Sequence, residues 1–189
     1  VRGKQRGIDG FDAAASSCYA GIGGIAGAKL LSVATSWKII AEYDLSFLEV
    51  LQNGFVFYGG LIGGFLGLLL YCRVYHLPYA DFLDVFAVRV PLGHAIGRVG
   101  CFLSGCCYGV PYDGFPSVVY TAAADPNTPL GVPLFAVQLV ESACLLLLYL
   151  ALELLFHRSK KGTCAFVYLF AYAFIRFVLE FFRGDPIRG

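Results

Sequence analysis

The sequence predicts an all-α protein, a polytopic transmembrane helical bundle with about five spans. Of its 189 residues, 58% are hydrophobic and 14% are charged, and the mean hydropathy is +0.71. This composition argues against a water-soluble fold. The apolar residues form long continuous runs and do not alternate with polar ones, which argues against the strands of a membrane β-barrel. We expect residues 1–189 to form a single integral membrane domain.

Five apolar runs are long enough to cross a membrane, which takes about 20 mostly apolar residues for roughly 30 Å of hydrocarbon. The first two runs carry small residues at helical spacing, and the third carries a histidine and an arginine. The fourth is rich in leucine, and the fifth carries a line of polar side chains. The predicted spans are residues 11–37, 55–75, 82–104, 133–156 and 163–182.

Small residues recur on one face of each of the first two spans. In lipid, small side chains let two helix backbones approach closely, so we expect most of these glycines to pack helices together. Gly59 and Gly60, which follow Tyr58 at the outward entry of the second span, are equally compatible with the floor of a cavity. The small residues are Ala20, Gly23, Gly24, Gly27 and Ala28 in the first span, and Gly59, Gly60, Gly63, Gly64 and Gly67 in the second.

The distribution of lysine and arginine predicts which ends of the spans face the cytoplasm. Basic residues precede the first span and follow the second and fourth, namely Arg2, Lys4, Arg6, Arg73, Arg158, Lys160 and Lys161. The opposite side receives an acidic loop with Glu42, Asp44 and Glu49, and loop 107–132, which has no Lys or Arg. The third span therefore ends on the outer face. The net charge of +1, without a basic stripe, predicts no nucleic-acid binding.

A histidine and an arginine lie inside the third span. They belong to the segment HAIGRVGCFLSGCCYGVP, residues 94–111. Hydrocarbon tolerates such residues only where they face protein or trapped water, so an ionisable group at this depth indicates a functional site. His94 is one turn deeper than Arg98 on the same face. It is either a candidate base or a packing histidine bonded to a neighbouring helix.

The seven cysteines fall into two groups. Cys101, Cys106 and Cys107 gather at the outer end of the third span, where a disulfide or a reactive thiol is open. Zinc is disfavoured, because adjacent cysteines lack the usual C-x(2–4)-C spacing and no histidine pair follows. The others lie within spans and are expected to act as small apolar residues. They are Cys18, Cys72, Cys144 and Cys164.

The last span carries Tyr172, Arg176, Glu180 and Arg183 at spacings of four, four and three, which places them on one helix face. One interpretation is an internal Arg-Glu-Arg ladder, with Arg183 reaching the interface. The other is an anion site, because Arg98 and Arg176 both lie roughly 9 Å from the outer ends of their spans. Glu180 supplies one negative charge and a phosphate would supply the rest. Arginine binds phosphate bidentately, so a lipid head group is the expected ligand.

Four segments, taken in order, resemble the prolipoprotein diacylglyceryl transferase family. The family has seven spans, and this chain resembles the central five, which fits chain ends that look cut close to a span and lack a signal-peptide core. The segments are YGGLIGG at 58–64, GRVGCFLSGCCYGVP at 97–111, QLVE at 138–141 and YAFIRFVLEFFRGDP at 172–186.

The resemblance implies an enzyme that transfers diacylglyceryl from phosphatidylglycerol to the lipobox cysteine thiol of a prelipoprotein, releasing glycerol phosphate. The expected partners are phosphatidylglycerol, the lipobox peptide and membrane lipid. The expected location is the bacterial inner membrane, with the active site toward the outer face. No cofactor and no metal are expected.

The resemblance also implies the site residues. The catalytic candidates are Arg98, which matches the arginine of the family's G-R-x-G signature, Arg176, Glu180, Tyr58 and His94. Tyr58 stands where the family has a histidine, which removes the most easily assigned base; His94 is a partial substitute. Cys101 and Ser104 stand for asparagines and Cys106 for a glutamate. The substrate-binding candidates are Arg183, Tyr172, Gly59, Gly60, Gly97, Gly100, Cys101, Gly105, Cys106, Gly109, Gln138 and Glu141.

Two functions of other classes remain open from the residues. A membrane thiol-disulfide oxidoreductase would use Cys101, Cys106 and Cys107. A non-catalytic lipid-binding or transport protein would use the same scaffold without chemistry. Only the transferase needs all the arginines, and only the oxidoreductase needs the cysteines.

Overall fold

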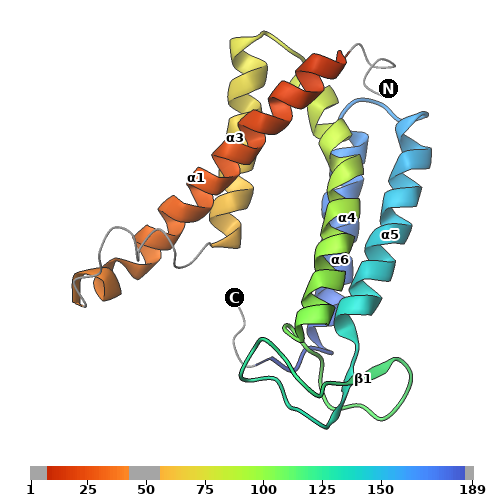
Figure 1. Ribbon diagram of the computed structural model, residues 1–189. Helices are drawn as coiled ribbons and strands as arrows, with labels where there is room; N and C mark the ends of the chain where they lie inside the picture. Colours follow the sequence, from red (N-terminus) through yellow and green to blue (C-terminus); the bar gives the residue numbers. More distant parts are fainter. Residues whose placement is uncertain (1–7, 43–55, 186–189) are drawn as a thin grey trace. The chain divides into compact units, whose positions relative to one another are not determined.

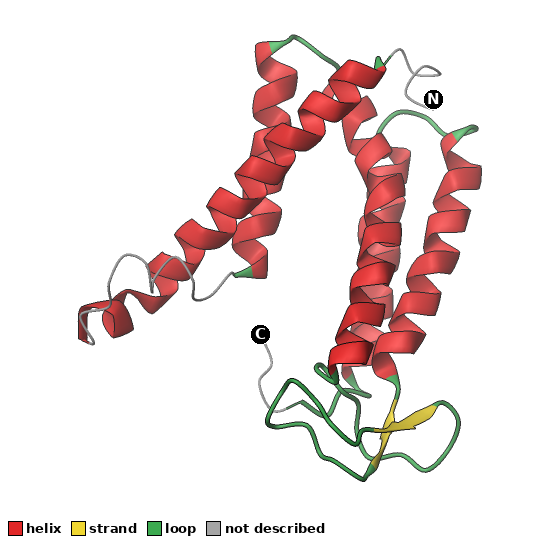
Figure 2. Cartoon of the chain, in the orientation of Figure 1, coloured by secondary structure: helices red, strands yellow, loops and turns green. Residues whose placement is uncertain are grey.

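The computed structural model describes residues 8–42 and 56–185, and within them the chain is mainly helical (Figures 1 and 2). It divides into two compact units, residues 1–82 and 83–189. The helices are α1 (Gly10–Glu42), α3 (Phe57–Val74), α4 (Tyr79–Ser104), α5 (Val137–Phe156) and α6 (Thr163–Glu180), and the strands are β1 (Ser117–Val119) and β2 (Pro133–Phe135).

Four of these helices are long and apolar enough to cross a membrane, which confirms the prediction of an all-α polytopic membrane protein. They are α4, α5, α6 and the part of α1 from Gly10 to Trp37, while Tyr58–Val74 forms a shorter apolar helix. The predicted start of the fourth span at residue 133 is wrong, because Pro133–Phe135 forms β2 and α5 begins only at Val137.

The predicted orientation rests partly on residues outside the described ranges. Arg2, Lys4, Arg6, Asp44 and Glu49 lie there. The assignment of the outer face, and of residues 1–189 to one integral membrane domain, therefore stays a prediction.

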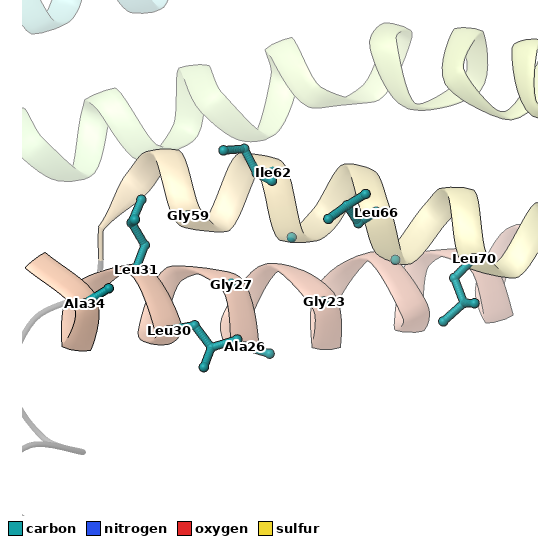
Figure 3. A pocket seen from close by; sticks show the side chains of 12 residues that line it. Gly23, Ala26, Gly27, Leu30, Leu31, Ala34, Gly59, Ile62, Leu66 and Leu70 are labelled. Atoms are coloured by element: carbon teal, nitrogen blue, oxygen red, sulfur yellow. The ribbon is translucent and has the colours of Figure 1, made fainter.

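Helices α1 and α3 pack through their glycines, which confirms the packing interpretation. A Cβ added at Gly63 would lie 2.1 Å from the Gly23 carbonyl oxygen, and one added at Gly27 would lie 2.3 Å from that of Gly59. A Cβ added at Gly60 would make an ordinary contact with the Ala28 Cβ, 3.5 Å away. Gly59 and Gly60 therefore serve helix contact in this unit. Beside them runs an apolar groove of about 580 Å³, which Figure 3 shows between the leucines of the two helices.

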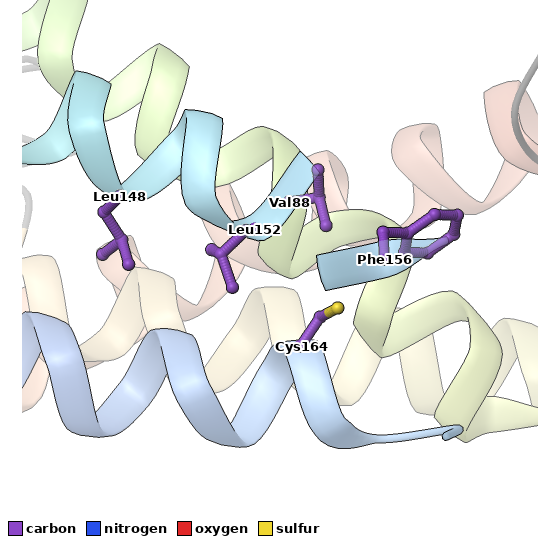
Figure 4. Packing of buried hydrophobic residues seen from close by; sticks show 5 residues of the cluster. All are labelled: Val88, Leu148, Leu152, Phe156 and Cys164. Atoms are coloured by element: carbon purple, nitrogen blue, oxygen red, sulfur yellow. The ribbon is translucent and has the colours of Figure 1, made fainter. Parts of the chain in front are cut away.

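Helices α4, α5 and α6 run side by side in the second unit (Figure 1). Val88, Leu148, Leu152, Phe156 and Cys164 form their buried apolar cluster (Figure 4). Cys164 is fully buried there, as expected for a small apolar residue.

Asp84 of α4 fixes the start of α6. Its carboxylate oxygens accept hydrogen bonds from the backbone N–H groups of Gly162, at 2.8 Å, and Ala165, at 2.9 Å. The first N–H groups of a helix have no partner within the helix, and its N-terminus favours negative charge. This buried carboxylate satisfies both requirements, so α4 and α6 start together and run in parallel.

A folded cap joins α4 to α5 at the other end of this bundle. Strands β1 and β2 pair antiparallel, and a small core forms around Tyr108, Tyr120 and Leu134. The Tyr108 hydroxyl donates to the Asn127 carbonyl at 2.8 Å, and burial raises the pKa of Tyr108. The sequence predicted this segment only as a loop, because its pairing joins residues far apart in the chain.

Candidate functional site

The centre of the candidate site is an ion pair between α4 and α5. Arg98 Nε lies 3.0 Å from Glu141 Oε2, with the Glu141 side chain 4% exposed and that of Arg98 16% exposed. One residue along α5, the Ser142 hydroxyl donates to the Ala95 carbonyl at 3.0 Å. This hydrogen bond joins α5 to the backbone of α4 between His94 and Arg98. It therefore fixes the register of the two helices at the Arg98–Glu141 ion pair.

Glu141 also gathers two aromatic neighbours. The Tyr172 hydroxyl donates to Glu141 Oε1 at 3.4 Å, and His94 Nε2 lies 3.9 Å from the same oxygen. The His94 and Tyr172 rings meet edge to face, with centroids 5.0 Å apart. A buried carboxylate thus connects residues of α4, α5 and α6, and His94 belongs to this polar cluster.

Arg176 completes the cluster from α6. Its Nη1 lies 2.5 Å from Glu180 Oε2, one turn further along the helix. Arg176 is also within electrostatic range of His94 and Tyr172. The predicted pairing of Arg176 with Glu180 is confirmed, whereas Arg98 takes Glu141 as its carboxylate partner.

The two arginines lie at similar depth for a reason that the fold supplies. Asp84 near the start of α4 caps the start of α6, so the helices share one origin. Arg98 and Arg176 both lie about 20 Å further along, at about 1.5 Å per residue. The structure therefore places residues Arg98 and Arg176 at a similar level along their helices inside an apolar bundle, where ionisable side chains are costly unless they serve a function.

Each arginine has a carboxylate beside it. Arg98 Nε faces Glu141 at 3.0 Å, and Arg176 Nη1 faces Glu180 at 2.5 Å. Glu141 and Glu180 together balance both charges, so charge balance alone does not require a phosphate. A guanidinium group offers five N–H donors, so each arginine can hold a carboxylate and an anionic ligand at the same time. Whether a phosphate binds there stays a prediction.

Arg183 is not on the helix face where the sequence placed it. Helix α6 ends at Glu180, and Arg183 instead pairs with Asp185, with Nε donating to Oδ1 at 2.7 Å. Gly109 and Arg183 form an isolated antiparallel bridge, and Val110 N–H donates to the Phe182 carbonyl at 3.0 Å. This pairing with the cap ends the helix early, so the predicted ladder of Arg176, Glu180 and Arg183 is wrong at its last member.

Asp185, which the sequence did not single out, holds Arg183 in place. Burial alone would raise the pKa of Asp185, but hydrogen bonds and the positive charge of Arg183 outweigh burial and lower it. The same hydrogen bonds raise the pKa of Arg183. The pair therefore stays ionised at neutral pH.

Three thiols meet at the C-terminal end of α4. The sulfur atoms of Cys101, Cys106 and Cys107 all lie within 4.8 Å of one another, and each residue is partly buried. Burial, followed by the neighbouring Cys101 and Cys107 thiols, raises the pKa of Cys106 to about 12. All three are free cysteines.

Gln138 and four glycines lie near the C-terminal end of α4. The Gln138 amide donates to the Cys106 carbonyl at 2.8 Å. Gly105 has a φ of +71°, and a Cβ at Gly109 would lie 2.4 Å from the Phe135 carbonyl oxygen. At Gly97 and Gly100 a Cβ would meet nothing within 4 Å among the described residues. Within this unit, these two glycines leave room on their own side of α4.

Tyr58 lies in the first turn of α3 and is mostly exposed within its own unit. That unit is described separately from the one that holds Arg98, so the role of Tyr58 stays a prediction, as do those of the other candidates. The role of Glu141 as the partner of Arg98 was missed, although a glutamate about two turns into a predicted span was the available signal.

Comparison with known proteins bears on this site. A family model described as "Prolipoprotein diacylglyceryl transferase" matches residues 2–188. The phosphatidylglycerol–prolipoprotein diacylglyceryl transferase 2 of Clostridium perfringens is 34% identical over 188 residues, covering 98% of this chain and 72% of that protein. The corresponding transferase of Clostridium tetani is 37% identical over 166 residues (87% and 66%). That of Parasynechococcus marenigrum is 35% identical over 171 residues (86% and 62%). The chain thus spans about two thirds of the length of these relatives.

Proposed function

The chain belongs to the prolipoprotein diacylglyceryl transferase family, and we propose that it transfers the diacylglyceryl group of phosphatidylglycerol to the cysteine thiol of a prelipoprotein lipobox. The observation that carries the proposal is the presence of two arginines, Arg98 and Arg176, inside an apolar bundle, each held by a carboxylate. The names of its relatives supply the two substrate classes. The proposed setting is the bacterial inner membrane, with the site toward the outer face.

The transfer is a displacement at the glyceryl carbon that bears the phosphate. The acceptor sulfur forms a bond to that carbon while the carbon–oxygen bond to the phosphate breaks, and the electron pair stays on the phosphate oxygen. The thiol proton passes to a base. The products are the thioether of the lipobox cysteine and glycerol phosphate.

Arg98 and Arg176 act on the phosphate. Negative charge grows on the departing phosphate oxygen, and preorganised donors in a dry site stabilise such charge better than water does. Guanidinium groups suit this task because they offer several N–H donors in a planar fork. Glu141 and Glu180 hold the two forks in place through the ion pairs described above.

His94 is the proposed proton acceptor. Its imidazole lies beside Glu141 and Tyr172, one turn from Arg98. A candidate general base is judged first by its position and then by its pKa. The contacts of His94 with Glu141 and Tyr172 hold its imidazole in place. Gly97 and Gly100, which flank Arg98 in the sequence, leave room on α4 for a lipid chain.

The direct test uses the full-length protein in detergent or nanodiscs with phosphatidylglycerol and a synthetic lipobox peptide. The proposal predicts a peptide whose mass increases by one diacylglyceryl group and which resists reduction, as expected for a thioether. No modified peptide, with the protein folded by thermal melting, would overturn the proposal.

The three neighbouring thiols allow the oxidoreductase alternative to be tested separately. In a transferase the reacting thiol belongs to the peptide, whereas a redox enzyme must use its own. A variant with Cys101, Cys106 and Cys107 all changed to Ser should therefore retain transfer, at a rate reduced through lost packing. Complete loss of transfer, with the variant still folded, would favour the redox alternative.

A further inference from the structure

The end of α4 brings Cys101 and Cys106 together through its backbone. Gly105 adopts a left-handed φ of +71°, Gly105 N–H bonds to the Phe102 carbonyl at 3.2 Å, and Cys106 N–H bonds to the Cys101 carbonyl at 3.1 Å. This is the Schellman arrangement of a helix C-terminus, in which the residue after the glycine contacts the one five positions before it. The cysteine spacing thus follows from the cap.

Cys107 joins the other two through a left-handed backbone conformation. Its φ is +56°, which is uncommon for a residue with a side chain and costs free energy unless its surroundings impose it. The neighbouring backbone is fixed on both sides, because Gln138 donates to the Cys106 carbonyl at 2.8 Å and Gly184 N–H donates to that of Tyr108 at 3.0 Å. Three sulfurs are therefore held together on a rigid frame.

The dimensions suit a metal ion with soft ligands. With zinc–sulfur bonds of about 2.3 Å, three thiolates in tetrahedral geometry place their sulfurs about 3.8 Å apart. The thiols lie within 4.8 Å of one another, so rotations about the Cα–Cβ bonds close the difference. Each cysteine is partly buried, which leaves a path for the ion, and Arg183 is within electrostatic range of Cys107.

We propose that Cys101, Cys106 and Cys107 form a three-thiolate site for one thiophilic d¹⁰ cation, of the class of Zn²⁺, Cd²⁺ and Cu⁺. Binding forms three metal–sulfur bonds and releases the three thiol protons to solvent, with no change of oxidation state. Soft thiolate ligands select this class over Mg²⁺ or Ca²⁺. The site joins the last turn of α4 to the start of the cap. It differs from the metal-free expectation drawn from ligand spacing, which considered zinc-finger patterns only.

The test measures metal binding and does not depend on transferase activity. The full-length protein, reduced with a phosphine and held without oxidant, is titrated with Cd²⁺ while its thiolate-to-cadmium ultraviolet band is recorded. Alkylation of each cysteine by N-ethylmaleimide is followed by mass spectrometry with Cd²⁺, Zn²⁺ or Mg²⁺. We expect one Cd²⁺ per chain and an alkylation rate at the three cysteines about ten-fold lower when free Cd²⁺ is about ten times its Kd, with Mg²⁺ giving no protection.

Two matched variants complete the test. Cys106→Ser should abolish the cadmium band and expose Cys101 and Cys107 to alkylation. Cys144→Ser, which removes a partly buried thiol of α5, should leave the band and the protection unchanged. Unprotected thiols in the wild-type protein, a band that disappears equally in Cys144→Ser, or a disulfide among the three in the protein as isolated would overturn the proposal. The wild-type protection experiment remains decisive if Cys106→Ser fails to fold.

Discussion

Replacing Glu141 by glutamine removes the charge that holds Arg98. The side chain of Glu141 is 4% exposed and its Oε2 lies 3.0 Å from Arg98 Nε. Removing one partner of a buried ion pair costs about 3–5 kcal/mol, because the remaining charge is left uncompensated. That cost applies to folding and lowers the melting temperature. The effect on activity is separate: losing one preorganised donor to a transition state costs roughly a hundred- to a thousand-fold in kcat, so we expect a misplaced Arg98 to lower kcat/KM by roughly a hundred-fold.

A second buried glutamate on the same helix, Glu153, provides a matched control. Glu153 of α5 is also largely buried and pairs with an arginine of α4, Arg89, at 3.5 Å. It lies about 18 Å from Glu141 along the helix, at about 1.5 Å per residue. Glu153→Gln should therefore lower the melting temperature without the hundred-fold loss of activity.

The assay follows lipid transfer to a lipobox peptide at several peptide and lipid concentrations, with protein abundance in the membrane and thermal melting measured in parallel. We expect Glu141→Gln to insert and fold, with its defect concentrated in kcat/KM. Activity within five-fold of wild type, or an equal loss in Glu153→Gln, would refute the reasoning that Glu141 positions a phosphate-binding arginine.

Three further predictions concern the other charged residues. Arg98→Ala should abolish transfer with insertion intact, and Arg98→Lys should recover little of it, because an ammonium lacks the bidentate fork; near-normal turnover of either variant in the peptide assay would contradict this role. Glu180→Gln should reduce transfer only about two- to five-fold, because an ion pair whose Glu180 side chain is 37% exposed contributes about 0.5–1 kcal/mol. Arg176→Ala should abolish transfer. Equal losses in the two variants would show that Glu180 does more than hold Arg176. Asp185→Asn should destabilise the protein by about 2 kcal/mol at pH 7. Folding lowers the pKa of Asp185, so this stabilisation is present above the ordinary pKa of 3.8 and is lost as the pH falls through the pKa of the folded state. The melting temperatures of wild type and variant should therefore converge in acid. A difference that stays constant with pH would count against the pair with Arg183.

The spans were predictable because membrane crossing imposes a length and a composition on a continuous segment. The glycines of α1 and α3 were predictable for a similar reason, since close helix contact in lipid needs small residues at helical spacing. The cap was not, because β2 pairs with β1 across a long connection and nothing local marks Pro133 as a strand rather than the start of a helix.

The sequence allowed the residues of the site to be identified, but it did not allow every ion pair among them to be predicted. Arg98 and Arg176 stood out because charge inside an apolar run is costly. That Arg98 pairs with Glu141 depends on how α4 and α5 are aligned, which the Ser142 bond to Ala95 fixes in three dimensions. Arg183 was misplaced because helical spacing was extended past Glu180, where pairing with the cap replaces the helix.

The central claim is that the two arginines stabilise a departing phosphate while diacylglyceryl moves to sulfur. Phosphatidylglycerol labelled separately in the diacylglyceryl part and in the glycerol phosphate head group tests this most directly, with the full-length protein and a lipobox peptide. The account predicts that the peptide acquires the diacylglyceryl label alone, that glycerol phosphate appears in equal amount, and that Arg98→Ala produces neither. Head-group label on the peptide, or equal product from Arg98→Ala, would contradict it.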